Sequence, residues 1–251
     1  MEQRPLYNYL LTLGDNAIIL GQRLGELCGH GPNLETDIAL TNIALDLLGQ
    51  TRGYFQYAAK QQEGKSEDDV AFLRKEREYC NVLLVEQPNT DFAYVITRQF
   101  FFDTYHLMLM EWLAVNCQDE TIQAIARKAV KEVRYHHRFS SDWMRRLGDG
   151  TEESNSRLKQ AVEDLWPYTQ EFFVATEVET WAQQQGIGPD LLSFKEDYYA
   201  QLAQLLEEAT LSVPEQAYFQ KGGKQGIHTE HMGYLLADLQ YMQRTYPNMK
   251  W

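Results

Sequence analysis

The sequence predicts an all-α protein, a bundle of long helices with shorter helices around it. Two long stretches, Asp91–Trp112 and Glu120–Leu147, carry apolar residues at a helical period, and ionisable residues fall inside the apolar stripes. No stretch alternates apolar and polar residues with a period of two, as a half-buried strand would. Because burying carboxylates and imidazoles is costly unless they pair or bind a metal, the pattern indicates a polar centre inside a helical core.

A first helix is expected over Leu6–Cys28, where the Gly-rich turn 29–32 interrupts the apolar pattern. Either Asn33 or Thr36 can cap a second helix, because short polar side chains accept hydrogen bonds from the first free backbone N–H groups. Asp46 lies in this second helix, level with its apolar residues.

A third helix is expected after the polar turn at 63–66, with Glu76 and Tyr79 on one face. Pro88 ends it, because the residue before a proline is disfavoured in the helical conformation. One of the residues 89–90 then starts the helix that carries the first long stripe.

Asp119 is expected to cap the fifth helix, and the Gly-rich turn 148–151 to end it. A long sixth helix follows, kinked at Pro167. A seventh helix and a loop over 213–226 precede a last helix from about Thr229. No linker demands a boundary, so residues 1–251 are expected to form a single domain.

The net charge, apolar runs and cysteine spacing of the sequence limit the partners and the location that we expect for this protein. The net charge is -13, which argues against nucleic acid or an anionic membrane as a partner. No apolar run is long enough for a membrane span, and the N-terminal residues do not have the pattern of a signal peptide. The three cysteines lack CxxC spacing and are expected as buried free thiols. A cytoplasmic location is therefore expected.

The carboxylates have a regular spacing. Glu76 follows Asp46 by 30 residues, and Glu132 follows Asp103 by 29, so each pair spans one helix–turn–helix. Four-helix di-iron proteins place a lone carboxylate on one helix and Glu-x-x-His on the next, twice. The spacing therefore predicts a ferritin-like four-helix bundle whose helices carry these four carboxylates.

Both histidine positions of that pattern hold tyrosine, Tyr79 and Tyr135. His106 and His136 lie on the inward faces but at other offsets. We interpret the set as a degenerate site without metal, catalytic residues or cofactor, held by hydrogen bonds from the tyrosines to carboxylates and by cationic histidines. Taken singly, each carboxylate also fits a solvated helix face, and His106 a hydrogen-bonded core histidine.

Several stretches carry a family resemblance. They are LGDNAIILGQRLGELCGHGPNLETDIALTNIALDLLGQTR, LLVEQPN, KEVRYHHRFS, GGKQGIHTEHMG and LQYMQRTYP. In these, nearly the whole chain resembles the structural C subunits (PaaC type) of bacterial ring-1,2-phenylacetyl-CoA epoxidase, a phenylacetyl-CoA monooxygenase of aerobic phenylacetate degradation.

The resemblance implies a non-catalytic subunit with a degenerate site. It implies a homologous A subunit that carries the di-iron centre and binds the CoA thioester, and a small B subunit. It also implies a reductase with FAD and an iron–sulfur centre that delivers electrons from NADPH. The resemblance does not decide whether the chain also associates with itself.

A loop with two lysines has two interpretations. Lys221, Gly222, Gly223, Lys224 and His228 could form a flexible basic contact to the partner subunit or to the phosphates of its thioester. Alternatively, they form a solvated loop before the last helix, with Thr229 as its cap.

Two other functions compete with the scaffold role. One is an autonomous di-iron oxygenase that uses His106 and His136 as displaced ligands. The other is a ferritin-like metal store or a stand-alone protein that binds CoA thioesters. Iron content and co-purification with a homologous subunit separate these possibilities.

Overall fold

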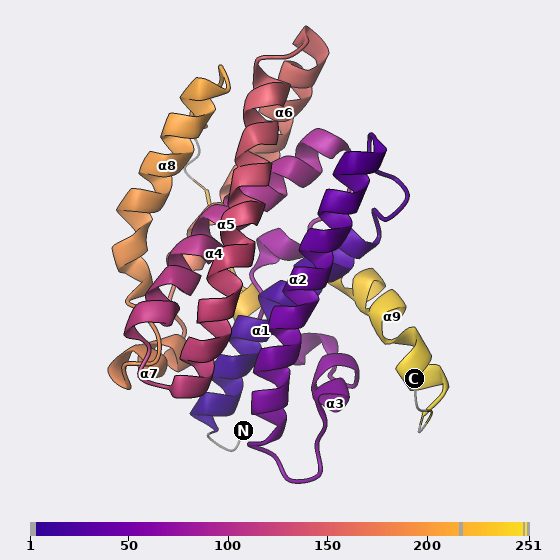
Figure 1. The fold of residues 1–251 in the computed structure, drawn as a ribbon, viewed down its shortest axis with the longest axis vertical. Coiled ribbons are helices and arrows are strands. Elements are labelled where there is room, and N and C mark those ends of the chain that lie inside the picture. Colours follow the sequence, from indigo (N-terminus) through magenta and orange to yellow (C-terminus); the bar gives the residue numbers. More distant parts are fainter. Residues whose placement is uncertain (1–3, 216–217, 248, 250–251) are drawn as a thin grey trace. The chain divides into compact units, whose positions relative to one another are not determined.

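The computed structural model describes residues 4–215, 218–247 and 249, and throughout these residues the regular structure is helical, without a strand (Figure 1). The predicted all-α class is confirmed, and the helices are consistent with a ferritin-like helical bundle. The chain divides into two compact units, residues 1–88 with 222–251, and residues 89–221. The single domain expected for 1–251 stays a prediction.

The first unit is built on two long helices, α1 (Pro5–Gly25) and α2 (Leu34–Ala59), which lie side by side (Figure 1). Shorter elements complete it: α3 (Glu67–Phe72), η1 (Glu76–Glu78), η2 (Leu83–Glu86), η5 (Gly223–Gln225) and α9 (Glu230–Thr245). Helix α1 is buried on nearly all sides from Tyr9 to Leu24, whereas α2 buries one face.

The turn between α1 and α2 is closed by two side chains. Of the two predicted candidates, Asn33 caps α2, because its side chain accepts a hydrogen bond from the Thr36 N–H at 2.9 Å. The Asp37 carboxylate accepts hydrogen bonds from the N–H groups of Gly31 and Gly29, and these bonds hold the pKa of Asp37 below its usual value.

The third helix is much shorter than predicted: α3 ends at Phe72, and Glu76 lies on a single 3₁₀ turn. The side chain of Arg74 explains the break. Its Nε donates to the Val70 carbonyl at 2.6 Å, the group that the Arg74 N–H would use in a continued helix. The expectation that Glu76 and Tyr79 share a helix face is therefore wrong.

The second unit is built on α4 (Phe92–Asn116) and α5 (Glu120–Gly148), which also lie side by side (Figure 1). Asp91 caps α4 by accepting from the Tyr94 N–H at 2.8 Å. Asp119 caps α5, as predicted, by accepting from the N–H groups of Thr121 and Ile122 at 2.9 Å.

The remaining elements of the second unit are α6 (Glu152–Leu165), η3 (Trp166–Phe173), α7 (Glu177–Gln184), η4 (Leu191–Phe194) and α8 (Lys195–Glu208). The sixth helix was expected to be kinked at Pro167, but α6 ends before it and a 3₁₀ segment follows. Proline has no N–H for the α-helical ladder, so the helix stops there. No helix in the described part of the chain is both long and apolar enough to cross a membrane.

The cysteines correct one expectation. Cys117 is buried as predicted, but Cys28 is exposed and Cys80 is half-buried.

Candidate functional site

The four predicted carboxylates are divided between the two units. Asp46 and Glu76 belong to the first unit, and Asp103 and Glu132 to the second. Their environments differ, since Asp103 is fully buried, Asp46 and Glu132 are half-buried, and Glu76 is exposed. Convergence of all four on one site stays a prediction.

Asp103 is the centre of a buried polar cluster in the second unit. Its Oδ2 accepts a hydrogen bond from the Ser140 hydroxyl at 2.8 Å, and its Oδ1 accepts one from the Gln99 amide at 2.7 Å. Burial raises the pKa of Asp103 to about 7, although His136 and the two hydrogen bonds oppose that rise. The carboxyl is therefore poised between its neutral and charged forms near neutral pH.

The histidines of this cluster are buried, with His106 3% exposed and His136 0% exposed. The ring of His106 stacks on Phe102 at a centroid distance of 4.9 Å. Burial and the nearby His136 lower the pKa of His106 to about 3, so this imidazole is neutral. The expectation that His106 is cationic and offsets carboxylate charge is therefore wrong.

The two tyrosines do not have the partners that we expected. The Tyr79 hydroxyl donates to the Ala71 carbonyl at 2.6 Å, not to a carboxylate, and accepts from the Gln240 amide at 2.9 Å. Tyr135 is 39% exposed, and the guanidinium of Arg138 lies 5.8 Å from the centre of its ring. Tyr79 is thus a structural link between the end of α3 and α9.

These residues do not fit a di-iron centre within either unit. Such a centre needs carboxylate oxygens that bridge metals and one imidazole for each iron. Both oxygens of Asp103 accept hydrogen bonds from neutral donors, and phenols stand in place of both imidazoles. Among the described residues, no group of three or more His, Cys, Asp or Glu side chains is placed to hold a metal ion.

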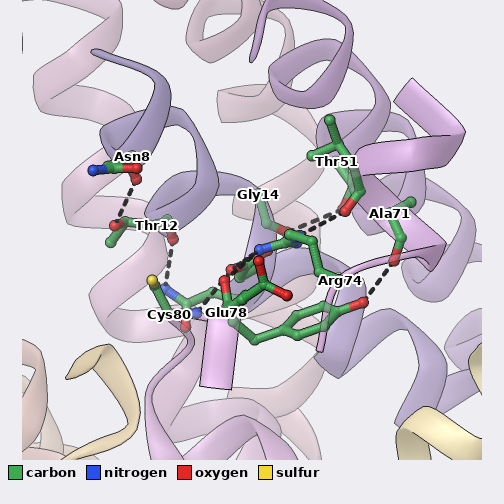
Figure 2. Close-up of polar contacts among 12 residues, drawn as sticks. Asn8, Thr12, Gly14, Thr51, Ala71, Arg74, Glu78 and Cys80 are labelled. Carbon is green, nitrogen blue, oxygen red and sulfur yellow. Dashed lines mark hydrogen bonds and ion pairs between the residues drawn. The ribbon is translucent and has the colours of Figure 1, made fainter. Parts of the chain in front are cut away.

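A second buried polar cluster was missed by the sequence analysis. Asp15, 0% exposed on α1, forms an ion pair with Arg74, which is 7% exposed. The Cys80 N–H also donates to Asp15, and Arg74 donates to the Glu78 carbonyl at 2.9 Å (Figure 2). The guanidinium lies 4.1 Å from the centre of the Tyr79 ring. This cluster joins α1 to the segment that follows α3.

A signal for this cluster was present in the sequence. Asp15 interrupts the apolar run LLTLGDNAIILG, the same pattern that drew attention to Asp103. Its partner could not be found in this way, because Arg74 lies 59 residues away. Burial lowers the pKa of Arg74, but the charge and hydrogen bonds of Asp15 outweigh this and keep the pKa above its usual value.

The loop that precedes α9 is packed rather than solvated. A Cβ added to Gly223 would lie 2.3 Å from the Asn81 carbonyl oxygen, and one added to Gly226 would lie 2.4 Å from that of Arg77. Gly226 also has a φ of 74°, which L side chains rarely adopt. Lys224 is only 8% exposed. The solvated-loop interpretation is therefore wrong for Gly223, Lys224 and Gly226, although Lys221 and Gln225 are exposed.

Two contacts of the His228 ring hold the end of this loop in place. Its Nδ1 lies 3.1 Å from an oxygen of the Glu86 carboxylate, and its Nε2 lies 3.1 Å from the Tyr79 carbonyl oxygen. The Thr229 N–H donates to the other oxygen of Glu86 at 2.8 Å. Thr229 occupies the N-cap position of α9 as expected, but its hydroxyl makes no capping hydrogen bond.

Comparison with known proteins gives two agreeing results. The family described as phenylacetic acid catabolic protein matches residues 1–251. The C subunit of 1,2-phenylacetyl-CoA epoxidase from Escherichia coli (strain K12) is 47% identical over 243 residues, which cover 97% of this chain and 98% of that protein. Both agree with the resemblance noted in the sequence.

Proposed function

Because this chain belongs to the phenylacetic acid catabolic protein family, we propose that it is the C subunit of a multicomponent phenylacetyl-CoA epoxidase. One observation carries the proposal: 47% identity to the C subunit of the Escherichia coli epoxidase over 97% of the chain. The identity extends along the whole of both proteins. It therefore favours the interpretation that they are corresponding subunits of similar complexes, and not two proteins that share one motif.

The proposed role is structural. The chain stabilises and positions a homologous A subunit, and that subunit holds the di-iron centre and the CoA thioester. The complex also contains a small B subunit, and a reductase with FAD and an iron–sulfur centre supplies electrons from NADPH. The overall reaction, on the partner and not on this chain, would place one atom of dioxygen in the aromatic ring as an epoxide, while two electrons from NADPH and two protons reduce the other atom to water.

The state of the ionisable side chains supports a non-catalytic role. The Asp103 carboxylate accepts hydrogen bonds from Ser140 and Gln99. The Tyr79 hydroxyl donates a hydrogen bond to the Ala71 carbonyl and accepts one from the Gln240 amide. His106 is buried against Phe102 with a pKa of about 3, too low for a proton acceptor at neutral pH. Asp103 thus joins α4 to α5, and Tyr79 joins the end of α3 to α9.

Within the loop, Lys221 is the lysine suited to contact the A subunit or the phosphates of its thioester, because it is exposed whereas Lys224 is buried. Reversal of one exposed charge changes binding by roughly 0.2–1 kcal/mol. Lys221→Glu should therefore weaken assembly or raise the KM severalfold, whereas Lys131→Glu, at an exposed lysine of α5, should not.

The test of the function is reconstitution. The chain, the A subunit, the B subunit and the reductase are purified, and epoxide formation from phenylacetyl-CoA, NADPH and dioxygen is followed by mass spectrometry. We expect no turnover by this chain without the A subunit, and an A subunit that is unstable or inactive without this chain. Turnover in a mixture that lacks the A subunit would overturn the proposal.

Metal analysis addresses the alternative of an autonomous oxygenase. The chain is purified after growth in iron-rich medium, and its iron is measured by mass spectrometry. About two iron ions per chain would favour the autonomous enzyme, because that is the content of a di-iron carboxylate site. Stoichiometric iron without turnover would instead favour the ferritin-like store.

A further inference from the structure

The C-terminal part of the first unit packs back on elements from the N-terminal part of the same unit. We call residues 222–245, which comprise η5 and α9, the strap. The second half of the strap is attached by hydrogen bonds from Gln240, whose amide donates to the Arg74 carbonyl and the Tyr79 hydroxyl, both at 2.9 Å. Arg244 also donates to the Arg74 carbonyl, at 3.0 Å. An amide and a guanidinium keep their protons at any ordinary pH, so this attachment does not titrate near neutral pH.

The first half of the strap is attached by a group that does titrate. The Nδ1 of His228 lies 3.1 Å from the Glu86 carboxylate, and its Nε2 lies 3.1 Å from the Tyr79 carbonyl oxygen. The Thr229 N–H donates to the other oxygen of Glu86 at 2.8 Å. We call His228, Thr229 and Glu86 the latch. A neutral ring has one N–H, so it must turn a lone pair toward one of the two oxygens, and the 0% exposed Glu86 then loses the charge of the imidazolium.

The closed latch also buries two oxygen atoms that make no hydrogen bond to the described residues, Asn81 Oδ1 and Thr229 Oγ1. Both residues contact Glu86, since the Asn81 amide nitrogen lies 3.5 Å from its Oε2. A buried oxygen without a partner is costly, whereas water satisfies it when the segment opens. Thr229 is also the N-cap residue of α9, and its hydroxyl does not cap the helix in the closed position. These costs oppose closure, so the imidazolium decides the position of the latch.

The charged groups around His228 come from several elements. Burial lowers the pKa of His228, but the hydrogen bond and charge of Glu86 on η2, a backbone carbonyl, and the charge of Glu76 on η1 raise it above its ordinary value. Arg23 on α1 donates to the backbone carbonyl of Glu86 at 2.8 Å. Lys224 on η5 is buried in the same loop. The two carboxylates act together, so the latch is closed when His228 is protonated.

We propose that the latch is a pH-sensitive device: when His228 loses its proton, residues 222–229 open, while the attachment at Gln240 keeps the second half of the strap in place. The closed state is favoured at low pH, and the open state becomes populated as the pH rises through the value at which the folded chain releases the proton. Opening involves this chain alone and does not depend on the proposed function.

Hydrogen exchange of the full chain, read by mass spectrometry at about pH 6 and about pH 9, tests the latch. Rates are divided by those of an unstructured peptide at the same pH, which gives a protection factor. The Thr229 amide donates to Glu86, and the amides of Gln225 and Gly226 donate to carbonyls within the loop. Their protection should fall by about tenfold or more at the higher pH, because a hydrogen bond to a charged group is lost. The fall should depend only weakly on added urea, as expected for local opening, whereas exchange in α1 should depend on it strongly.

Two variants separate the proton from the packing. His228→Gln cannot become cationic, so its loop should be weakly protected at both pH values. In Glu86→Gln, the amide oxygen can accept from Thr229 and the amide nitrogen can donate to a neutral His228, whose other nitrogen donates to the Tyr79 carbonyl. This variant should therefore keep its protection at about pH 9. His231→Gln is the matched control, because His231 is half-buried on α9 outside the latch, and it should retain the pH dependence of the unmodified chain.

Three results would overturn the proposal. The first is protection of residues 222–229 that is equal at both pH values in the unmodified chain. The second is a pH-dependent loss that persists in His228→Gln, or that is as large in Glu86→Gln as in the unmodified chain. The third is a loss with the same strong urea dependence as α1, which would show unfolding of the whole unit rather than opening of the latch.

Discussion

The Nδ1 atom of His228 lies 3.1 Å from a carboxylate oxygen of Glu86, although 142 residues separate the two in the sequence. The other ring nitrogen lies 3.1 Å from the Tyr79 carbonyl oxygen. A carbonyl accepts only, and an ionised carboxylate accepts only, so both contacts are satisfied when both ring nitrogens carry a proton. The geometry is that of an imidazolium ion held between two acceptors.

The pKa of His228 agrees with this geometry. Burial lowers it, but the hydrogen bond and charge of Glu86, the Tyr79 carbonyl and the more distant charge of Glu76 together raise it above the usual value. His228 therefore binds its proton more tightly in the folded chain than in the unfolded chain.

A first prediction is a loss of stability as the pH rises. The contribution of His228 is fully present below about pH 6.5, the unfolded value, and disappears as the pH passes the higher folded pKa. At pH 6, His228→Gln should lower the free energy of unfolding by roughly 1.5–3 kcal/mol, and the difference from the unmodified chain should shrink at higher pH. Urea unfolding over a pH series measures it.

The control is His30→Gln, because His30 is exposed and its ring nitrogen Nδ1 lies 3.2 Å from the Cys28 carbonyl oxygen rather than beside a buried carboxylate. The difference in the free energy of unfolding between His30→Gln and the unmodified chain should not change with pH in the way expected for His228→Gln. A pH-independent loss in His228→Gln would contradict the imidazolium.

A second prediction concerns the close approach of the loop to residues 77–83. Gly223→Ala places a Cβ 2.3 Å from the Asn81 carbonyl oxygen and 3.0 Å from the Leu83 nitrogen. Overpacking against backbone costs about 1–3 kcal/mol, so urea unfolding should show a loss of that size. Gly25→Ala, with no atom within 4 Å of the new Cβ, should unfold at the same or a slightly higher urea concentration. Equal stability of the two variants would mean that the loop is not held at this position.

A third prediction tests the buried ion pair between Asp15 and Arg74. Loss of one partner leaves a buried charge, so Asp15→Leu and Arg74→Met should each destabilise the chain by roughly 3–5 kcal/mol. The double variant should recover part of this loss, because neither charge then remains. A double-mutant cycle in urea measures the coupling. Additive losses would show that the two side chains act independently.

A fourth prediction uses Asp103, whose pKa burial raises to about 7. The folded chain retains a proton that the unfolded chain releases near pH 4, so Asp103 lowers stability progressively from about pH 4 to pH 7. Asp103→Asn removes this effect, and its stability relative to the unmodified chain should rise by up to about 4 kcal/mol over that range. Asp164→Asn, at an exposed carboxylate of α6, should show no such rise. If the difference in the free energy of unfolding between Asp103→Asn and the unmodified chain did not change with pH, the raised pKa of Asp103 would be contradicted.

Local pattern was enough to predict much of this molecule. Apolar residues at a helical period placed Asp103, His106 and His136 on inward faces, and all three are buried. Asn33 and Asp119 were predicted as helix caps for the same reason, since a cap and its N–H partners lie within four residues of each other. Each of these features depends on neighbours along one helix.

Only the tertiary structure decided which partners the buried polar groups find. Arg74 ends α3 because Asp15 lies on another helix 59 residues earlier, and the Tyr79 hydroxyl meets Gln240 from a segment 161 residues later. A buried donor or acceptor must be satisfied by whatever group the fold brings to it. Helical periodicity identifies the face that is buried, but it contains no information about the segment that covers that face.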